Sequence, residues 1–313
     1  MKFITNKEVP FLSKKQNVVL VAIFYTFLWG TAFPLVKLCM QYFNIADNDQ
    51  ASKCLVAGIR FLFSGVIILS VFGIQKVSLF SLSKKSYLWI LLYGFFSTTL
   101  QYSFTYIGLS NMDGAKGAIY DQLCVFFILI ISGLFCKDDF LSLKKSIGCI
   151  IGFVGIFLTS TSTSIFQLDY SFGGEGMMIL AATVQTIAYL IAKHTSKSIN
   201  ALSLVGIGQT AGGLILCVAA VLFGGELTSI SVLGIIFLIA LSLISATAYV
   251  LSVLPLKYFP ATEIASFNLL IPIFGVIMSG VILQENIFQW NYLLAIILIV
   301  LGIFIINYKK KKE

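Results

Sequence analysis

Charged side chains are scarce in this sequence of 313 residues: only 11% are Asp, Glu, Lys or Arg, whereas 58% are hydrophobic. The mean hydropathy is +0.98. A water-soluble domain cannot bury so large an apolar fraction, so the composition excludes that class. It predicts instead an all-α integral membrane protein whose chain crosses the bilayer several times.

The residues that most enzymes and metal sites need are also scarce. The single histidine, His194, has no acidic or cysteine residue near it in the sequence. The six cysteines are scattered without a C-x-x-C pair, which indicates small buried side chains rather than disulfides or metal ligands. No glycine-rich phosphate loop occurs. These absences argue against an enzyme and against ATP-driven transport, and we predict no catalytic residue, cofactor or metal.

Polar breaks separate ten apolar runs, most of them long enough for a bilayer core that needs about 20 helical residues. The predicted helices cover residues 18–40, 53–74, 87–109, 112–135, 147–161, 176–192, 201–223, 232–254, 261–283 and 292–307. Threading them from a cytoplasmic N terminus puts nearly all lysines on the inner side, as the positive-inside rule requires. The net charge of +8 then reflects membrane orientation rather than a nucleic-acid partner, and both termini are predicted to be cytoplasmic.

The second half of the chain repeats the first. With a shift of 147 residues, Tyr102 falls on Tyr249 and Asp138 falls on Glu285, without a gap from the third to the fifth predicted helix. Because each copy has five helices, an odd number, the second copy enters from the opposite face. Such inverted repeats around a central cavity are typical of transporters that alternate access, although duplication without transport is the alternative.

These patterns predict the domain organisation. We expect a cytoplasmic tail over residues 1–17, a first five-helix repeat over 18–161, an extracellular linker over 162–175, a second five-helix repeat over 176–308 and a basic cytoplasmic tail over 309–313. The predicted location is the plasma (inner) membrane of a bacterium, with the lipid bilayer as a partner. A homodimer is left open, because Gly148, Gly152 and Gly155 form a small-residue face on the fifth helix.

Four motifs carry a resemblance to a known family. The first helix reads WGTAFPLVK from Trp29, the second RFLFSG from Arg60, the third ends in YSFTYIGLS, and the ninth reads IASFNLLIPIFGVIMSGVILQE. In this order they resemble the drug/metabolite transporter superfamily, EamA type, across essentially the whole chain. The resemblance implies ten helices, a central cavity and a small-metabolite substrate, often moved outward and often coupled to protons. The sequence departs from the family pattern at the head of the fourth helix, where Asp121 stands.

Two charged residues inside apolar runs are the main site candidates. Asp121 and Arg60 lie about 13 Å and about 12 Å along their helices from the same face. An ionised side chain at the bilayer centre costs at least about 2.5–3.5 kcal/mol, so each should face a partner or water. A structural ion pair, a substrate or proton site, and no contact all remain open. As a site, the two would suit a zwitterion, with Arg60 for a carboxylate and Asp121 for an ammonium.

In the second half of the chain, uncharged amide residues stand at the positions that match these two charges in the repeat. Asp121 falls on Asn268 with the shift of 147, and Arg60 falls on Gln209 with a shift of 149. The other candidate cavity residues are Trp29, Gln101, Tyr102, Tyr120, Gln185 and Tyr249.

The sequence therefore predicts a secondary active transporter, an exporter by preference, for a small polar or zwitterionic metabolite such as an amino acid or derivative. It would work by alternating access, with proton coupling as an option. The alternatives are an efflux carrier for drugs or toxic compounds, a channel, and a membrane-embedded enzyme.

Overall fold

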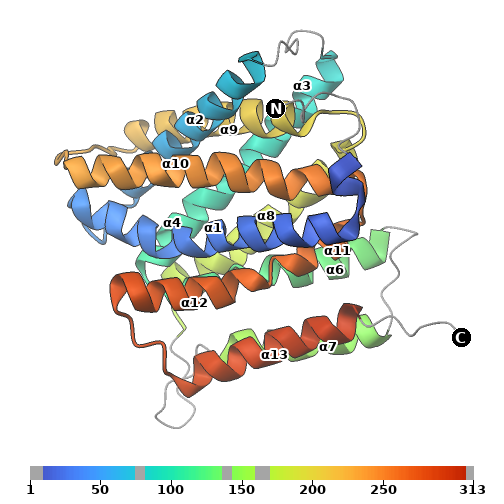
Figure 1. Cartoon of the computed structure of the whole chain (residues 1–313). Helices are drawn as coiled ribbons and strands as arrows, with labels where there is room; N and C mark the ends of the chain where they lie inside the picture. Colours follow the sequence, from blue (N-terminus) through green and yellow to red (C-terminus); the bar gives the residue numbers. More distant parts are fainter. Residues whose placement is uncertain (1–9, 75–81, 136–142, 159–169, 308–313) are drawn as a thin grey trace, which may run out of the picture.

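The computed structural model describes residues 10–74, 82–135, 143–158 and 170–307, and every regular element within these ranges is a helix (Figure 1). The α-helices are α1 (Lys15–Tyr42), α2 (Gln50–Ile74), α3 (Lys84–Gly94), α4 (Gln101–Ser110), α5 (Gly114–Tyr120), α6 (Leu123–Phe135), α7 (Leu143–Leu158), α8 (Met177–Thr195), α9 (Ala201–Leu222), α10 (Val232–Val253), α11 (Ala261–Phe267), α12 (Leu270–Leu283) and α13 (Trp290–Asn307). Short 3-10 turns are η1 (Pro10–Ser13) and η5 (Leu254–Lys257), and π-helical turns are η3 (Phe95–Leu100) and η4 (Phe172–Gly176).

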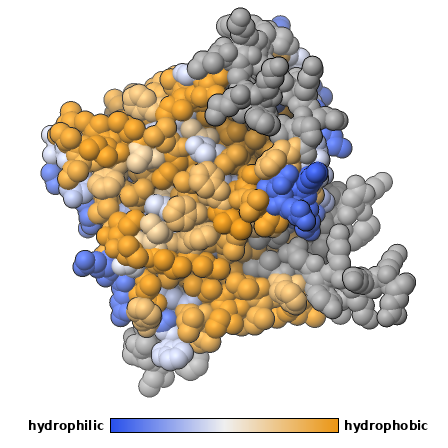
Figure 2. Space-filling view, in the orientation of Figure 1, coloured by the Kyte–Doolittle hydropathy of each residue, from blue (hydrophilic) through white to orange (hydrophobic). Residues whose placement is uncertain are grey.

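Seven helical stretches of the described residues are long and apolar enough to cross a membrane. They are Lys15–Tyr42, Gln50–Val71, Gly114–Ile131, Phe172–Thr195, Ala201–Leu222, Val232–Lys257 and Ala261–Leu283, and Trp290–Gly302 is a shorter apolar helix. Figure 2 shows hydrophobic surface over α10, α1, α12 and α13, with hydrophilic residues gathered toward the two ends of the helices. The protein is therefore a multi-pass membrane protein.

The first two helices begin earlier than predicted, because polar residues before each apolar run also adopt helical conformation. The first helix begins at Lys15 rather than at residue 18. The second begins at Gln50, three residues early, because the Asp49 carboxylate accepts the Ser52 N–H at 2.9 Å and caps it. Hydrogen bonding from Ser52 also lowers the pKa of the Asp49 carboxyl group. The predicted tail before residue 10, the tail after 307 and residues 162–169 of the predicted linker lie outside the described residues.

Three of the predicted helices are interrupted. The third consists of α3, the π-turn η3 and α4, while the fourth breaks at Asp121–Gln122 and the ninth at Asn268–Leu269. The ninth breaks because Pro272 has no N–H for the Asn268 carbonyl, which instead accepts the Ile271 N–H at 2.9 Å.

The two breaks coincide under the shift of 147 residues. α5 and α11 begin at 114 and 261, and α6 and α12 begin at 123 and 270. The Asp121 carbonyl accepts the Cys124 N–H at 3.3 Å, the counterpart of the bond at Asn268. The fourth predicted helix has Val125 where the ninth has Pro272, so its break forms without a proline.

Glycines let helices from the two halves of the chain approach closely. α2 packs along α9, and a Cβ on Gly213 would lie 2.9 Å from the Gly58 carbonyl oxygen. α7 packs along α13, where a Cβ on Gly302 would lie 2.4 Å from the Gly148 carbonyl oxygen. The glycine face of α7 thus serves packing within the chain, and the homodimer stays a prediction.

The first helix of each half of the chain packs against helices of the other half, and it does so in the same way in both halves. α1 packs against α10 and α12, and α8 packs against α4 and α6. α7 and α13 lie side by side at one edge of the molecule, below α12 in Figure 1. The largest buried hydrophobic cluster accordingly combines residues of α1, α2 and α4 with residues of α8, α9 and α10.

Candidate functional site

A partly open cavity lies among α1, α2, α4 and α8, beside the break that follows α5. Its walls are Trp29, Ala32, Phe33, Val36, Arg60, Gln101, Tyr102, Thr105, Tyr106, Leu109, Asp121 and Gln185. The space open to the centres of water molecules is about 40 Å³. This exceeds the roughly 10–15 Å³ that a cavity needs to admit one water molecule. A larger guest needs the walls to separate.

Arg60 is the charged residue held most firmly at this cavity. It is 2% exposed, and its Nε donates to Ser245 Oγ of α10 at 2.8 Å. Its Nη1 donates to the Tyr106 hydroxyl at 3.3 Å. The guanidinium carbon also lies 4.9 Å from the Phe61 ring centre and 5.6 Å from that of Tyr102, within cation–π range. Since a guanidinium has five N–H donors, some remain for a guest.

Asp121 lies at the break itself, directly after the last residue of α5. Its Oδ2 accepts a long hydrogen bond of 3.4 Å from the Gln122 amide. Arg60 and Asp121 line the same cavity but do not form an ion pair in the described part of the chain. The direct structural pair considered from the sequence is thus not formed, because Arg60 turns toward Ser245 and Tyr106.

Several polar atoms at this cavity have no hydrogen-bond partner within the described residues. They are Trp29 Nε1, Gln101 Oε1 and Gln185 Oε1. Buried polar groups are normally paired, so each such atom calls for an explanation. The oxygen and nitrogen of an amide can exchange places, so each glutamine offers either a donor or an acceptor. The cavity therefore presents unsatisfied polar groups beside two opposite charges, an arrangement that fits a polar guest.

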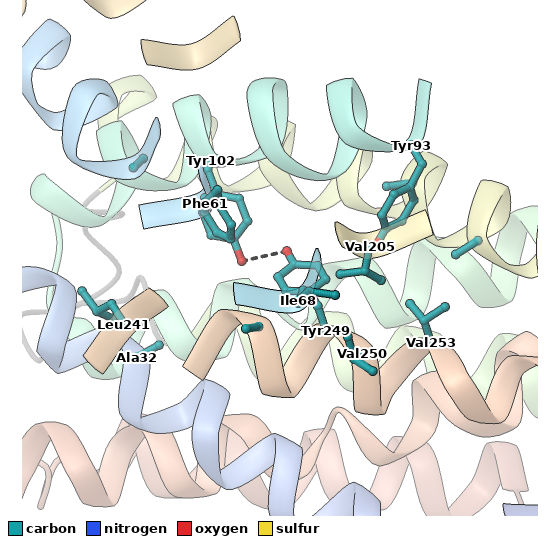
Figure 3. Packing of buried hydrophobic residues seen from close by; sticks show 14 of the residues in the cluster. Ala32, Phe61, Ile68, Tyr93, Tyr102, Val205, Leu241, Tyr249, Val250 and Val253 are labelled. Atoms are coloured by element: carbon teal, nitrogen blue, oxygen red, sulfur yellow. Dashed lines mark hydrogen bonds between the residues drawn. The ribbon is translucent and has the colours of Figure 1, made fainter. Parts of the chain in front are cut away.

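An aromatic cluster supports the wall behind Arg60. The Tyr249 hydroxyl of α10 donates to the Tyr102 hydroxyl at 2.8 Å, the dashed line in Figure 3. The Phe61 and Tyr102 rings lie 4.1 Å apart, and Trp29 meets Tyr249 edge to face at 5.4 Å. Tyr249 is therefore a supporting residue, in contact with Trp29 and Tyr102 on the wall.

The remaining predicted residues lie away from the cavity. Gln209 is buried between α2 and α9, where its Oε1 accepts from Ser64 Oγ at 2.5 Å. Asn268 lies at the second break and accepts from the Tyr25 hydroxyl at 3.1 Å. Tyr120 is 5% exposed and ends α5. The structure thus gathers Trp29, Arg60, Gln101, Tyr102, Asp121 and Gln185 in one cavity and leaves the others outside it.

Sequence reasoning missed two residues that matter for Arg60. Tyr106 lies four residues after Tyr102, one helical turn on, so helical spacing could have identified it. Ser245 lies 185 residues from Arg60, and its role follows from the packing of α10 on α2, which no local pattern reveals. Among the described residues, no group of three or more His, Cys, Asp or Glu side chains could hold a metal ion.

Comparison with known proteins shows the family to which this chain belongs. The EamA-like transporter family matches residues 16–161 and again 172–308, so the chain belongs to this family. It is 25% identical to the uncharacterized transporter YvbV of Bacillus subtilis, over 98% of this chain and 95% of that protein. It is 26% identical to an uncharacterized transporter of Haemophilus influenzae, over 95% and 99% of the two chains.

More distant proteins share the fold. A chloroplastic WAT1-related protein of Arabidopsis thaliana is 23% identical over 92% of this chain and 68% of that protein. A crystal structure of a protein at 14% identity has a TM-score of 0.72, covering 94% of this chain and 97% of the other. The protein is therefore a transporter in class.

Proposed function

We propose that this protein is a secondary carrier that exports a small zwitterionic metabolite, such as an amino acid or derivative, by alternating access. One observation carries the proposal: buried Arg60 and half-buried Asp121 line one cavity, and neither is neutralised by an ion pair among the described residues. A buried charge without a partner is costly, and in a membrane-spanning segment it marks a functional site by default.

The cavity geometry suggests how a zwitterion would bind. Its carboxylate would accept from the Arg60 donors that Ser245 and Tyr106 leave free, and its ammonium would donate to Asp121. The unpartnered ends of Gln101 and Gln185 would complete the hydrogen bonding. A volume of about 40 Å³ is too small for an amino acid, so binding and release require the surrounding helices to separate.

We also propose that the chain folds as ten membrane helices in two inverted five-helix halves, covering 18–161 and 176–308, with both termini in the cytoplasm. The matched breaks at Asp121 and Asn268, the matched packing of α1 and α8 and the double family match support the two halves. The lysine distribution supports the orientation, and the bacterial relatives support a bacterial inner membrane.

Counterflow in vesicles that contain only the purified protein tests the transport proposal. Vesicles loaded with one unlabelled amino acid should accumulate the same labelled amino acid transiently and saturably. A thermal-shift screen of amino acids, derivatives and lipophilic cations identifies the compound to load, since a ligand that binds the folded state raises the Tm. Stabilisation and counterflow with lipophilic cations alone would favour the drug-efflux alternative instead, for which the aromatic wall is suited but Arg60 is not.

A further inference from the structure

The first turn of α5 is held by side chains from the second half of the chain. Glu285, after α12, accepts the Gly114 N–H at 2.9 Å through Oε1 and the Ala115 N–H at 3.1 Å through Oε2. The first N–H groups of a helix have no partner within the helix, so this carboxylate caps α5 from another part of the chain. Lys37 Nζ of α1 lies 3.5 Å from Glu285 Oε1 and completes the ion pair.

Two further contacts hold the same turn. Lys116 forms an ion pair with Glu175 of η4, whose Oε2 accepts the Ser171 N–H at 2.8 Å. Asp113, at the N-cap position, makes no capping bond and instead accepts the Tyr292 hydroxyl of α13 at 3.2 Å. Thus Glu285, Glu175 and Tyr292, all from the region of the second family match, hold the segment 113–116.

The other end of α5 is the break at the cavity. α5 has seven residues and is followed at once by Asp121, where the backbone continues through a turn bond from the Gln122 N–H to the Ile119 carbonyl at 3.1 Å. Between its ends α5 packs Gly117 near the side chains of Leu109 and Phe33, both on the cavity wall. α5 also packs along α12, and the backbone at Asp121 stays right-handed helical (φ −55°, ψ −27°). The tighter turn bonds at Asp121–Gln122 mark the point at which α5 can pivot relative to α6, since 3-10 turns inside a helix often mark a hinge.

We propose that α5 is a gate between the cavity and the outer face, hinged at Asp121–Gln122 and latched by Glu285. The proposal rests on the proposed function for the meaning of the outer face and describes how access to the same site is controlled. Release of Glu285 would free Gly114 and Ala115 and let α5 swing away from Leu109 and Phe33. Because the hinge carries Asp121, gate movement would also move a charge of the binding site.

A thiol-labelling experiment tests the gate independently of transport. Val36→Cys places a reporter on the cavity wall near the Lys37 end of α1. Right-side-out vesicles are treated with a membrane-impermeant maleimide, and mass spectrometry follows labelling of this position alone, so the native cysteines do not interfere. Glu285→Gln has one oxygen acceptor where the carboxylate has two, and no charge, so it weakens the cap on Gly114 and Ala115 and removes the ion pair with Lys37. Labelling should then be about tenfold faster or more.

Two variants make the outcome specific. Lys37→Met leaves the two backbone bonds of Glu285 in place and should accelerate labelling less than Glu285→Gln. Lys15→Gln breaks the exposed ion pair with Glu263, 2.7 Å at the other end of α1, and should leave the rate unchanged. Equal rates for the parent and Glu285→Gln, or equal acceleration by Lys15→Gln, would overturn the gate. Counterflow of the same proteins reports separately on the proposed transport.

Discussion

Arg60 is the residue whose placement is hardest to explain by stability alone. The guanidinium is buried at 2% exposure, remains protonated at any physiological pH, and is held by two hydroxyl groups and two aromatic rings rather than by a carboxylate. An apolar side chain of similar volume would avoid the cost of removing a charge from water. We infer that the charge is retained because it binds the transported substrate.

Conservative substitutions at the two charges should weaken transport. Arg60→Lys keeps the charge but loses the planar fork, and Asp121→Asn keeps the shape but loses the charge. Each should weaken zwitterion binding about 10- to 100-fold, because a hydrogen bond to a charged group contributes about 1.5–3 kcal/mol. Counterflow KM values measure the effect. If Asp121 also carries a coupling proton, Asp121→Asn should abolish the pH dependence of transport. Unchanged transport and pH profile in folded Asp121→Asn and Arg60→Ala proteins would refute the charged site.

Ser245 should contribute to stability through Arg60. Ser245 Oγ accepts from Arg60 Nε, so Ser245→Ala should lower the free energy of unfolding by about 0.6–1.7 kcal/mol, the range for polar contacts between membrane helices. Ser242 is the matched control, because within the described ranges its hydroxyl, also on α10, donates only to the Leu238 carbonyl of its own helix. Thermal unfolding in detergent should show a larger loss of Tm for Ser245→Ala than for Ser242→Ala.

At the scale of the helix, hydropathy predicted where the helices lie better than it predicted whether each helix is continuous. The predicted apolar runs overlap the helices that the structure describes, because apolar length alone marks a membrane segment, but several helices extend beyond their runs, as α1 does at both ends. The breaks at Asp121 and Asn268 were not predicted, because Val125 gives no signal and Pro272 acts four residues before its own position. The repeat nevertheless aligned Asp121 with Asn268, and the structure places a break at both.

The packing of α7 on α13 should depend on the absence of a side chain at one position. Gly302→Ala would put a Cβ 2.4 Å from the Gly148 carbonyl oxygen, so the helices must move apart. Overpacking of this kind costs about 1–3 kcal/mol. Gly173→Ala serves as the control, because its Cβ would meet only the Asn111 side chain, at 3.8 Å. Thermal unfolding should separate the two variants, and an equal Tm would contradict the close contact.

For the whole molecule, orientation is the most direct prediction. A reporter fused after Lys312 should be active only in the cytoplasm, and a reporter inserted at Asp169 should be active only outside. Alkaline phosphatase and green fluorescent protein fusions distinguish the two sides. Reporters on the same side would exclude an odd number of membrane crossings between Asp169 and Lys312, that is, in the second half.

The sequence predicted part of the site because some of its residues stand out within a single helix. Trp29 lies in a family motif, Gln101 and Gln185 are amides inside apolar helices, and all three line the cavity. Gln209 and Asn268 were proposed from the repeat but lie elsewhere, because the cavity draws its wall mainly from α1 and α4. Which faces turn inward depends on long-range packing, as at Arg60 and Ser245.

The opposite charges at the cavity also determine how the carrier would respond to an electric field. With Asp121 ionised, Arg60 and Asp121 sum to zero, and a zwitterion adds no net charge. A turnover that moves only the substrate would therefore be electroneutral, and the membrane potential, which acts on each transferred charge with about 2.3 kcal/mol per 100 mV, would neither drive nor oppose it. A proton that travels on Asp121 would change this: each turnover would carry one charge, and transport would generate a current.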